Sequence, residues 1–143
     1  MEIDWATPAD VPAVEGLLSA AGLPLEGARE AFALGVVGRE GGRVVAAAAV
    51  EKYGAAGLLR SVVVDSAVRG TGLGRSIVAA AEDAARDAAV RELYLLTETA
   101  VDWFPRLGYE VVARSEAAAA VGESIEFTTV CRDAGVAMRK LLG

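Results

Sequence analysis

Apolar residues gather in seven short runs that have the length and composition of β-strands. The run at residues 58–64 is almost wholly apolar, so we expect it to lie near the centre of a sheet with both faces covered. Glu40-Gly41-Gly42 separates the second and third runs and predicts a hairpin turn. The runs cover residues 3–6, 36–39, 43–51, 58–64, 92–97, 109–113 and 136–142.

The segments between these runs have the periodicity of helices. Thr7 is expected to cap the first helix, with Pro8 at the first helical position and apolar residues recurring up to Gly22. The longest helix is expected at residues 73–88, where small side chains on one face allow close packing on a sheet. That face consists of Ile77, Ala80, Ala81, Ala84 and Ala85. Shorter helices are expected at residues 25–33, 100–107, 116–121 and 124–130.

This order of elements predicts one α/β (α+β) domain over residues 1–143. We expect a mixed central sheet of about seven strands flanked by helices. Residues 115–133 form a helical insertion before the last strand, and long insertions in compact domains are often functional.

Composition excludes several classes of function. A net charge of −6 argues against nucleic acid and against anionic membranes as partners. No apolar run reaches the roughly 18 residues that cross a bilayer, and the first residues lack a signal peptide, so we expect a cytoplasmic protein. The chain has no histidine, which excludes Ser-His-Asp and Cys-His catalysis and argues against a metal site. Cys131 is the only cysteine, so no internal disulfide forms.

The most informative segment is Arg69-Gly70-Thr71-Gly72-Leu73-Gly74, which lies between the strand at 58–64 and the helix at 73–88. Glycines let backbone N–H groups approach an anion, and a helix N-terminus adds free N–H groups and partial positive charge. The glycine offsets fit neither the dinucleotide fingerprint nor the P-loop. A pyrophosphate is the expected ligand, and the alternative is a tight left-handed turn at a strand–helix corner.

The segment from Val62 to Gly74 closely resembles the acetyl-CoA-binding motif of the GNAT N-acetyltransferases, and the predicted order of elements matches the GNAT fold over essentially the whole chain. The resemblance implies acetyl-CoA as cosubstrate, with its pyrophosphate on the glycine loop and its pantetheine arm along the preceding strand. The valines of that strand are also expected to be core residues, and a valine can pack in the core while its backbone contacts the pantetheine arm. The implied contacts are Val62, Val63, Val64, Arg69, Gly70, Thr71, Gly72, Leu73, Gly74, Arg75 and Phe104.

Acetyl transfer needs a base for the amine, a donor for the developing oxyanion and a proton for the departing thiolate. Many GNAT enzymes carry Phe-Tyr-x-x-x-Gly-Phe, in which the tyrosine is the acid. This chain reads Trp103-Phe104-Pro105-Arg106-Leu107-Gly108-Tyr109, and Phe104 has no proton to give. Glu98 is the candidate base because it follows a strand at its carboxyl end. The alternative for Glu98 is an acid that interacts with a helix N-terminus.

Four further residues have two interpretations each. Arg60 lies in an apolar strand and needs a partner. It could bind a substrate carboxylate or another oxyanion, or reach solvent at a strand end. Ser61 is a candidate catalytic residue in contact with the acceptor, or a satisfied strand serine. Thr97 contacts a ligand or caps a turn, and Cys131 faces substrate or is a small buried apolar residue.

Residues 59–65, 92–100 and 126–131 are similar to one GNAT branch, the arsenic-resistance N-acetyltransferases. The similarity implies acetylation of a small amine, such as an amino-acid analogue that bears arsenic or phosphorus and whose oxyanion would suit Arg60. Two other functions stay open. One is a catalytically silent acyl-CoA-binding module, and the other is acetylation of a protein N-terminus or lysine. The apolar last strand allows a homodimer.

Overall fold

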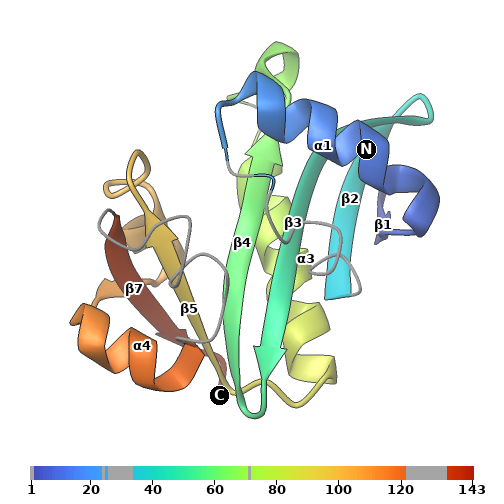
Figure 1. The fold of residues 1–143 in the computed structure, drawn as a ribbon. Coiled ribbons are helices and arrows are strands. Elements are labelled where there is room, and N and C mark those ends of the chain that lie inside the picture. The colour runs from blue at the N-terminus through green and yellow to red at the C-terminus, as the bar shows by residue number, and fades with distance from the viewer. Residues whose placement is uncertain (1, 24, 26–33, 71, 122–134) are drawn as a thin grey trace.

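The computed structural model describes residues 2–23, 25, 34–70, 72–121 and 135–143. In these residues seven strands form one mixed sheet in the order β1-β2-β3-β4-β5-β7-β6 (Figure 1). Only β4 and β5 are parallel, and every other neighbouring pair is antiparallel. The strands are β1 (Glu2–Trp5), β2 (Gly35–Glu40), β3 (Arg43–Tyr53), β4 (Ala56–Val64), β5 (Glu92–Thr97), β6 (Glu110–Val111) and β7 (Val136–Leu141). The predicted mixed sheet of about seven strands is confirmed.

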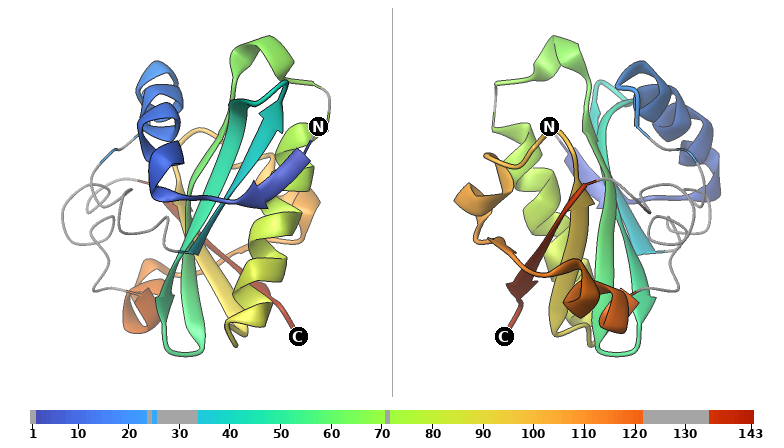
Figure 2. Two further views of the ribbon diagram at one scale, coloured as in Figure 1. Left: turned by 90° about the vertical axis from the view of Figure 1, so that its right-hand side faces the viewer. Right: turned by 60° about the vertical axis from the view of Figure 1, so that its left-hand side comes forward.

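Helices cover both faces of the sheet (Figure 2). Helix α3 (Leu73–Asp87) lies on one face, and α1 (Val11–Ala20) and α4 (Arg114–Val121) lie on the other. The predicted apolar face of α3 is confirmed, because Ile77, Ala81, Ala84 and Ala85 are buried and Ala80 packs at its margin. Small side chains there let the helix approach β2, β3 and β4 closely.

Strands β4 and β5 pair over a short stretch only. Their parallel register joins Ala56–Leu58 to Glu92–Tyr94, and beyond it β4 continues to Val64 and β5 to Thr97 without a shared ladder. A β-bulge also interrupts the other edge of β4, where the register with β3 shifts between Ala47 and Ala49. The carboxyl ends of the two strands therefore diverge, and their backbone groups are available for other partners.

Two predicted elements differ from the structure. Residues 100–107 do not form a continuous helix. A turn leads instead into a 3₁₀ segment at Phe104–Leu107, because Pro105 lacks the N–H that an α-helix would bond to the carbonyl of residue 101. The strand expected at 109–113 is reduced to Glu110–Val111, since Tyr109 turns into the core.

The insertion and the second helix are described only in part. Helix α4 confirms the helix expected at 116–121 and begins two residues earlier. The helix expected at 124–130 lies outside the described residues, as does almost all of the one at 25–33. In the part of the chain that the structure describes, no helix is long and apolar enough to cross a membrane.

Thr7 is the N-cap of the first helical turn as predicted, but its side chain has an unexpected partner. Its backbone N–H and its hydroxyl both donate to Asp10 Oδ2, at 2.9 and 3.1 Å. The same oxygen accepts a hydrogen bond from Arg39 Nη2 at 2.8 Å. Asp10 is 7% exposed, so this carboxylate ties the start of α1 to β2 from a nearly buried position.

These contacts make the stability of the fold depend on pH. The hydrogen bond from Arg39 is the main cause that lowers the pKa of Asp10 below its usual value of 3.8. A carboxyl whose pKa is lowered in the folded state stabilises the protein above its unfolded pKa, and that stability is lost as the pH falls through the folded value. We expect Asp10→Asn to lower the free energy of unfolding by about 1–3 kcal/mol at pH 7.

Urea unfolding between pH 7 and pH 3 measures this effect, with Asp83→Asn as the control because the Asp83 side chain is 75% exposed. The difference between the parent protein and Asp10→Asn should shrink towards pH 3, while Asp83→Asn stays close to the parent throughout. A difference for Asp10→Asn that is constant across this range would contradict the assignment.

Candidate active site

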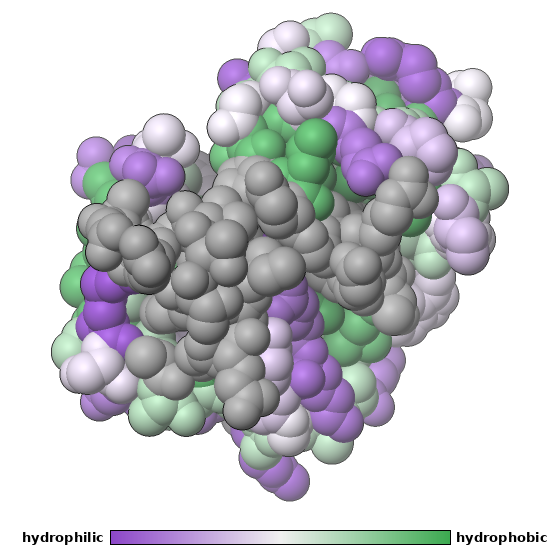
Figure 3. All heavy atoms as spheres, viewed as in Figure 1, coloured by the Kyte–Doolittle hydropathy of each residue, from purple (hydrophilic) through white to green (hydrophobic). Residues whose placement is uncertain are grey.

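The divergence of β4 and β5 opens a cavity of about 710 Å³. Its walls come from the carboxyl ends of both strands, from the glycine loop with the first turn of α3, and from the segment after α1. Figure 3 shows the face that carries α1 and α4, where hydrophobic side chains reach the surface beside α1 and the carboxyl end of β4. The cavity volume is in the range of sites that hold small molecules and cofactors.

The wall formed by β4 contains a distorted residue. Ser61 has a φ of +57°, in the left-handed region that non-glycine residues rarely adopt. Ser61 and Val62 together face the single residue Ala48 of β3, which defines the bulge. The bulge takes backbone N–H and C=O groups of β4 out of the ladder at a cavity-lining position. Such strain in a pocket wall is typical of a functional site.

Val62, Val63 and Val64 line the cavity and also belong to the core. Val63 is buried under α1, while Val62 and Val64 pack against the cluster below α3. The two interpretations of these valines therefore hold together, since side chains can pack while the backbone borders the cavity. The backbone of this stretch forms the floor between the bulge and the glycine loop.

The glycine loop closes one end of the cavity. Gly70 and Gly72 have φ values of +84° and +79°, and Gly72 is the N-cap of α3. A glycine cap has no side chain to bond the first N–H groups of the helix, so these donors remain for a ligand. Arg69 and Arg75 are exposed on either side, and Arg69 Nε donates to the carbonyl of Val64 at 3.3 Å. Thr71 lies outside the described residues.

Arg60 occupies the opposite part of the β4 wall. Its side chain is fully buried, so the expectation of a strand-end arginine that reaches solvent is wrong. Arg60 Nη1 donates to Glu51 Oε2 at 2.9 Å, and Glu51 Oε1 accepts from the Tyr53 hydroxyl at 2.6 Å. Arg60 Nε also donates to Ser61 Oγ at 3.2 Å. This chain of hydrogen bonds fixes the guanidinium and leaves the proton of the Ser61 hydroxyl free to be donated.

Glu51 and Tyr53 were missed by the sequence analysis, although a signal existed. The hairpin that joins β3 to β4 pairs Tyr53 with Ala56 and Ala49 with Arg60. Glu51 is then the diagonal neighbour of Arg60 on the same face of the sheet. A glutamate and an arginine in two otherwise apolar strands joined by a short turn could have been paired from this register.

Thr97, Glu98 and Thr99 form the wall at the end of β5. Thr97 is buried, and its hydroxyl accepts a hydrogen bond from the N–H of Ala100 at 3.0 Å, so it does cap the turn after the strand. Glu98 and Thr99 are exposed in a bend. No α-helix begins at Glu98, because the next helical segment is the 3₁₀ turn at Phe104–Leu107. The helix-terminus interpretation of Glu98 is therefore wrong.

Phe104 lines the cavity and is 7% exposed. Its ring stands edge-on between Trp103 and Tyr109, with centroid distances of 4.9 and 5.6 Å. Tyr109 lies behind Phe104 in the core, and its hydroxyl donates to Glu82 Oε2 at 2.8 Å. Burial, followed by the nearby Glu82 carboxylate, raises the pKa of Tyr109, which keeps the phenol protonated. Tyr109 therefore does not replace the missing acid.

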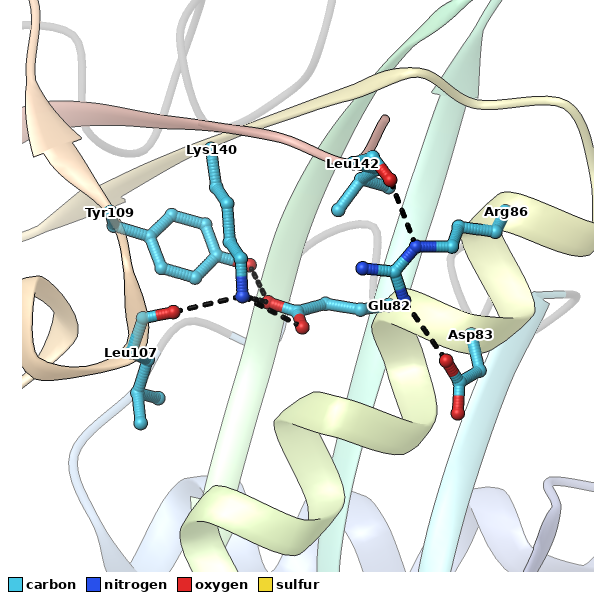
Figure 4. A network of polar contacts seen from close by, with 7 residues as sticks. All are labelled: Glu82, Asp83, Arg86, Leu107, Tyr109, Lys140 and Leu142. Atoms are coloured by element: carbon cyan, nitrogen blue, oxygen red, sulfur yellow. Dashed lines mark hydrogen bonds and ion pairs between the residues drawn. The ribbon is translucent and has the colours of Figure 1, made fainter.

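Glu82 is the centre of a buried polar cluster that the sequence analysis did not predict (Figure 4). Its two carboxylate oxygens accept hydrogen bonds from Lys140 Nζ at 3.1 and 3.0 Å. Lys140 also donates to the carbonyl of Leu107 at 2.8 Å and lies 5.6 Å from the Tyr109 ring centroid. One turn later in α3, Arg86 Nε donates to the carbonyl of Leu142 at 3.0 Å. The cluster joins α3 to β7 and to the segment that carries Phe104.

The comparisons with known proteins agree with this geometry. A family profile described as an acetyltransferase (GNAT) domain matches residues 32–111, which is more than half of the chain. This chain belongs to the GNAT acetyltransferase family. A search of curated proteins finds no match.

Solved structures share the GNAT fold at low sequence identity. N-acetylglutamate synthase from Neisseria gonorrhoeae, complexed with coenzyme A and N-acetyl-glutamate, aligns with a TM-score of 0.84 and 18% identity, covering 99% of this chain but 35% of that one. This GNAT chain thus spans about a third of the length of that synthase. Rv2747 from Mycobacterium tuberculosis, in complex with CoA and NLQ, aligns with a TM-score of 0.78 and 22% identity over 99% of both chains. A GNAT acetyltransferase from Staphylococcus aureus Mu50 aligns with a TM-score of 0.80 and 11% identity over 99% of both chains.

The structure brings most of the predicted GNAT site residues to one cavity. Glu98, Ser61, Arg60, Thr97 and Phe104 line it together with the described residues of the glycine loop. Cys131 lies outside the described residues, so its predicted contact with substrate stays a prediction. Among the residues that the structure describes, no three histidine, cysteine, aspartate or glutamate side chains gather as metal ligands would.

The cluster at Glu82 predicts that removing one of its charges destabilises the fold more than removing both. Lys140→Met should lower the free energy of unfolding of this GNAT domain by about 3 kcal/mol, because it leaves the Glu82 carboxylate buried without its cation. Glu82→Gln combined with Lys140→Met should recover much of the loss, since no charge remains to be desolvated.

Urea unfolding gives the free energies, with Lys52→Met as the matched control on an exposed lysine. If Lys140→Met unfolds at the same urea concentration as Lys52→Met, the cluster does not stabilise the fold as described.

Proposed function

We propose that this GNAT protein transfers the acetyl group of acetyl-CoA to the amine of a small molecule. The observation that carries the proposal is one continuous cavity with anion-binding groups at one end and polar side chains at the other. The glycine loop and Arg69 lie at the first end, and Arg60, Ser61 and Glu98 lie at the second. A cosubstrate that bears a pyrophosphate on one end and a thioester on the other matches this arrangement of groups along the cavity.

The residues present fit acetyl-CoA. A pyrophosphate on the free N–H groups at the start of α3 would be neutralised by Arg69 and Arg75. Neither Gly70 nor Gly72 has an atom within 4 Å of the position where a Cβ would stand, which leaves room for a ligand to approach the backbone. The pantetheine arm would follow Val62, Val63 and Val64, with its amides bonded to the backbone that β5 leaves unpaired. The thioester would then lie beside Phe104.

In the proposed reaction Glu98 takes a proton from the acceptor amine, whose lone pair then attacks the thioester carbonyl carbon. The negative charge that develops on the carbonyl oxygen is stabilised by donors at the bulge, namely a backbone N–H and the Ser61 hydroxyl. Arg60 strengthens that hydroxyl as a donor, because its guanidinium donates to the same oxygen. The C–S bond breaks and its electrons leave with sulfur, the nitrogen releases its second proton to solvent as the amide forms, and the thiolate takes a proton from solvent.

The acceptor is proposed to be an amino acid or an amino-acid analogue with an acidic group. Its carboxylate, phosphinate or arsenic oxyanion is proposed to bind beside Arg60, which lines the cavity and shares its charge with Glu51. One structural neighbour supports this class, because it is complexed with coenzyme A and N-acetyl-glutamate. Thr97 and Cys131 are proposed as further substrate contacts. Resistance to arsenic- or phosphorus-containing analogues in the cytoplasm, by a homodimer, is the proposed role in the cell.

Phe104 favours a second candidate function. A GNAT fold without the usual tyrosine acid could bind acyl-CoA without turning it over. Turnover of acetyl-CoA separates this binding module from an enzyme.

The first test is release of thiol from acetyl-CoA, followed with a thiol reagent across a panel of acceptors. The panel contains amino acids, their phosphorus and arsenic analogues, polyamines, aminoglycosides and short peptides. We expect release with acidic amino acids or their oxyanion analogues and none with polyamines. Tight binding of acetyl-CoA in calorimetry without release for any acceptor would favour the binding module, and release with peptides alone would overturn the proposed acceptor.

The second test concerns Glu98. Loss of a general base typically costs 10²–10⁴-fold in rate, so we expect Glu98→Gln to lower kcat by about 100-fold or more while the Kd of acetyl-CoA is unchanged. Glu40→Gln is the matched control, because Glu40 is exposed at the hairpin between β2 and β3, outside the cavity lining. Equal activity of the two variants would remove Glu98 from the mechanism.

A further inference from the structure

Trp103 occupies a position that neither the resemblance nor the comparisons assign to a function. It lines the cavity and is partly exposed, unlike the buried Phe104 and Tyr109. Its ring meets Phe104 edge-on at a centroid distance of 4.9 Å and an interplanar angle of 70°. The indole therefore continues the aromatic wall from Phe104 towards the mouth of the cavity.

The far side of the indole reaches the first turn of α3. A Cβ placed on Gly74 would lie 3.1 Å from Trp103 Cζ2 and 3.5 Å from Trp103 Cη2. The same point lies 3.7 Å from Cγ2 of Val64, at the end of β4. The indole thus lies against the helix terminus and the end of β4 on one side and against Phe104 on the other.

The Trp103 contact gives Gly74 a reason to be glycine that a positive φ does not supply. Gly72 needs to be glycine for its φ of +79°, and the space beside it is open. Gly74 is the opposite case, because its φ is not positive and the space beside it is filled by the indole. Glycine inside a helix costs roughly 1 kcal/mol relative to alanine, so the first turn of α3 keeps a destabilising residue in order to let the ring approach.

We propose that Trp103 binds the cosubstrate: its indole and Phe104 form the wall on which the pantetheine arm lies, and Gly74 sets the position of the indole. The inference rests on the proposed function, because it needs acetyl-CoA in this cavity. Pantetheine alternates apolar carbons with amides, and a partly exposed indole offers such a chain an apolar face. The placement follows from the contacts of Trp103, which touch the helix terminus that would hold the pyrophosphate and the ring that would lie beside the thioester.

Trp103 can be observed directly, because the chain has only two tryptophans. Trp5 lies on the edge strand β1, is 56% exposed and is not part of the cavity lining. In the Trp5→Phe variant the tryptophan emission comes from Trp103 alone. We expect that emission to change saturably with acetyl-CoA and with S-acetylpantetheine, and to stay unchanged with 3',5'-ADP.

Affinity gives a second readout. Trp103→Ala should raise the Kd of acetyl-CoA about tenfold, measured by calorimetry, as expected for the loss of one aromatic wall residue. Gly74→Ala should also raise this Kd, because the added methyl would stand 3.1 Å from Trp103 Cζ2 and force the indole to shift slightly. Adding Trp103→Phe to Gly74→Ala should restore part of the affinity, since the smaller ring vacates the space of Cζ2 and Cη2. Gly16→Ala is the matched control, because Gly16 is also helical and a Cβ there meets nothing within 4 Å.

The outcomes separate this inference from the proposed function. Binding of acetyl-CoA with unchanged Trp103 emission and an unchanged Kd for Trp103→Ala would overturn the role of Trp103 and leave the acetyltransferase in place. An emission change with 3',5'-ADP but not with S-acetylpantetheine would show that Trp103 contacts the nucleotide, and would overturn its place beside pantetheine. Failure of the parent protein to bind acetyl-CoA would overturn both. If Gly74→Ala does not fold, the emission titration and Trp103→Ala still decide the question.

Discussion

The short parallel pairing of β4 with β5 is the constraint on which the rest of this structure depends. Three residues on each strand share a ladder, and the rest of each strand, which is the larger part of β4 and half of β5, diverges. In the right-handed β4-α3-β5 crossover, α3 starts beside the carboxyl end of β4 and leads the chain back to the start of β5. The same divergence therefore places a helix N-terminus at one end of the opening and unpaired strand backbone along its sides. The cavity, and with it the proposed anion site and reactive centre, is a consequence of one break in the sheet.

Such a break weakens the sheet at its centre, and two clusters of buried charged groups support the paired regions on either side of it. Helix α3 packs on β2, β3 and β4, whereas Glu82 on the same helix reaches Lys140 on β7. The ion pair thus connects α3 to the β5–β7 half of the sheet, at the level where β4 and β5 still pair. On the opposite face Glu51 and Arg60 tie β3 to β4 beside the bulge. In each cluster a tyrosine hydroxyl donates to the carboxylate, which satisfies more of its lone pairs than one cation can.

Local sequence signals predicted the strands, the long helix and the glycine loop because each depends on neighbours within a few residues. The apolar run before Arg69 and the glycines after it could be interpreted without knowing the fold. The left-handed backbone of Ser61 could not be predicted in this way, since a bulge depends on how β4 registers with β3. The partnership of Glu82 with Lys140 spans 58 residues and arises only when α3 and β7 pack together. The helix expected at 100–107 failed for a local reason, because apolar periodicity outweighed the signal of Pro105.

Phe104 in place of a tyrosine does not by itself prevent acetyl transfer. A thiol has a pKa near 8.5, so a thiolate leaves without being protonated in the same step, whereas a protonated amine must lose a proton before it can attack. The base is therefore the more demanding requirement, and the acid can be solvent. An apolar ring beside the sulfur also excludes water from the thioester, which strengthens the hydrogen bonds that the bulge offers to the oxyanion. With Trp103 beside it, Phe104 forms an aromatic wall, which in the proposed mechanism orients the thioester by packing. In the proposed mechanism the chemistry then rests on Glu98 and on the donors at Ser61, which line the same cavity.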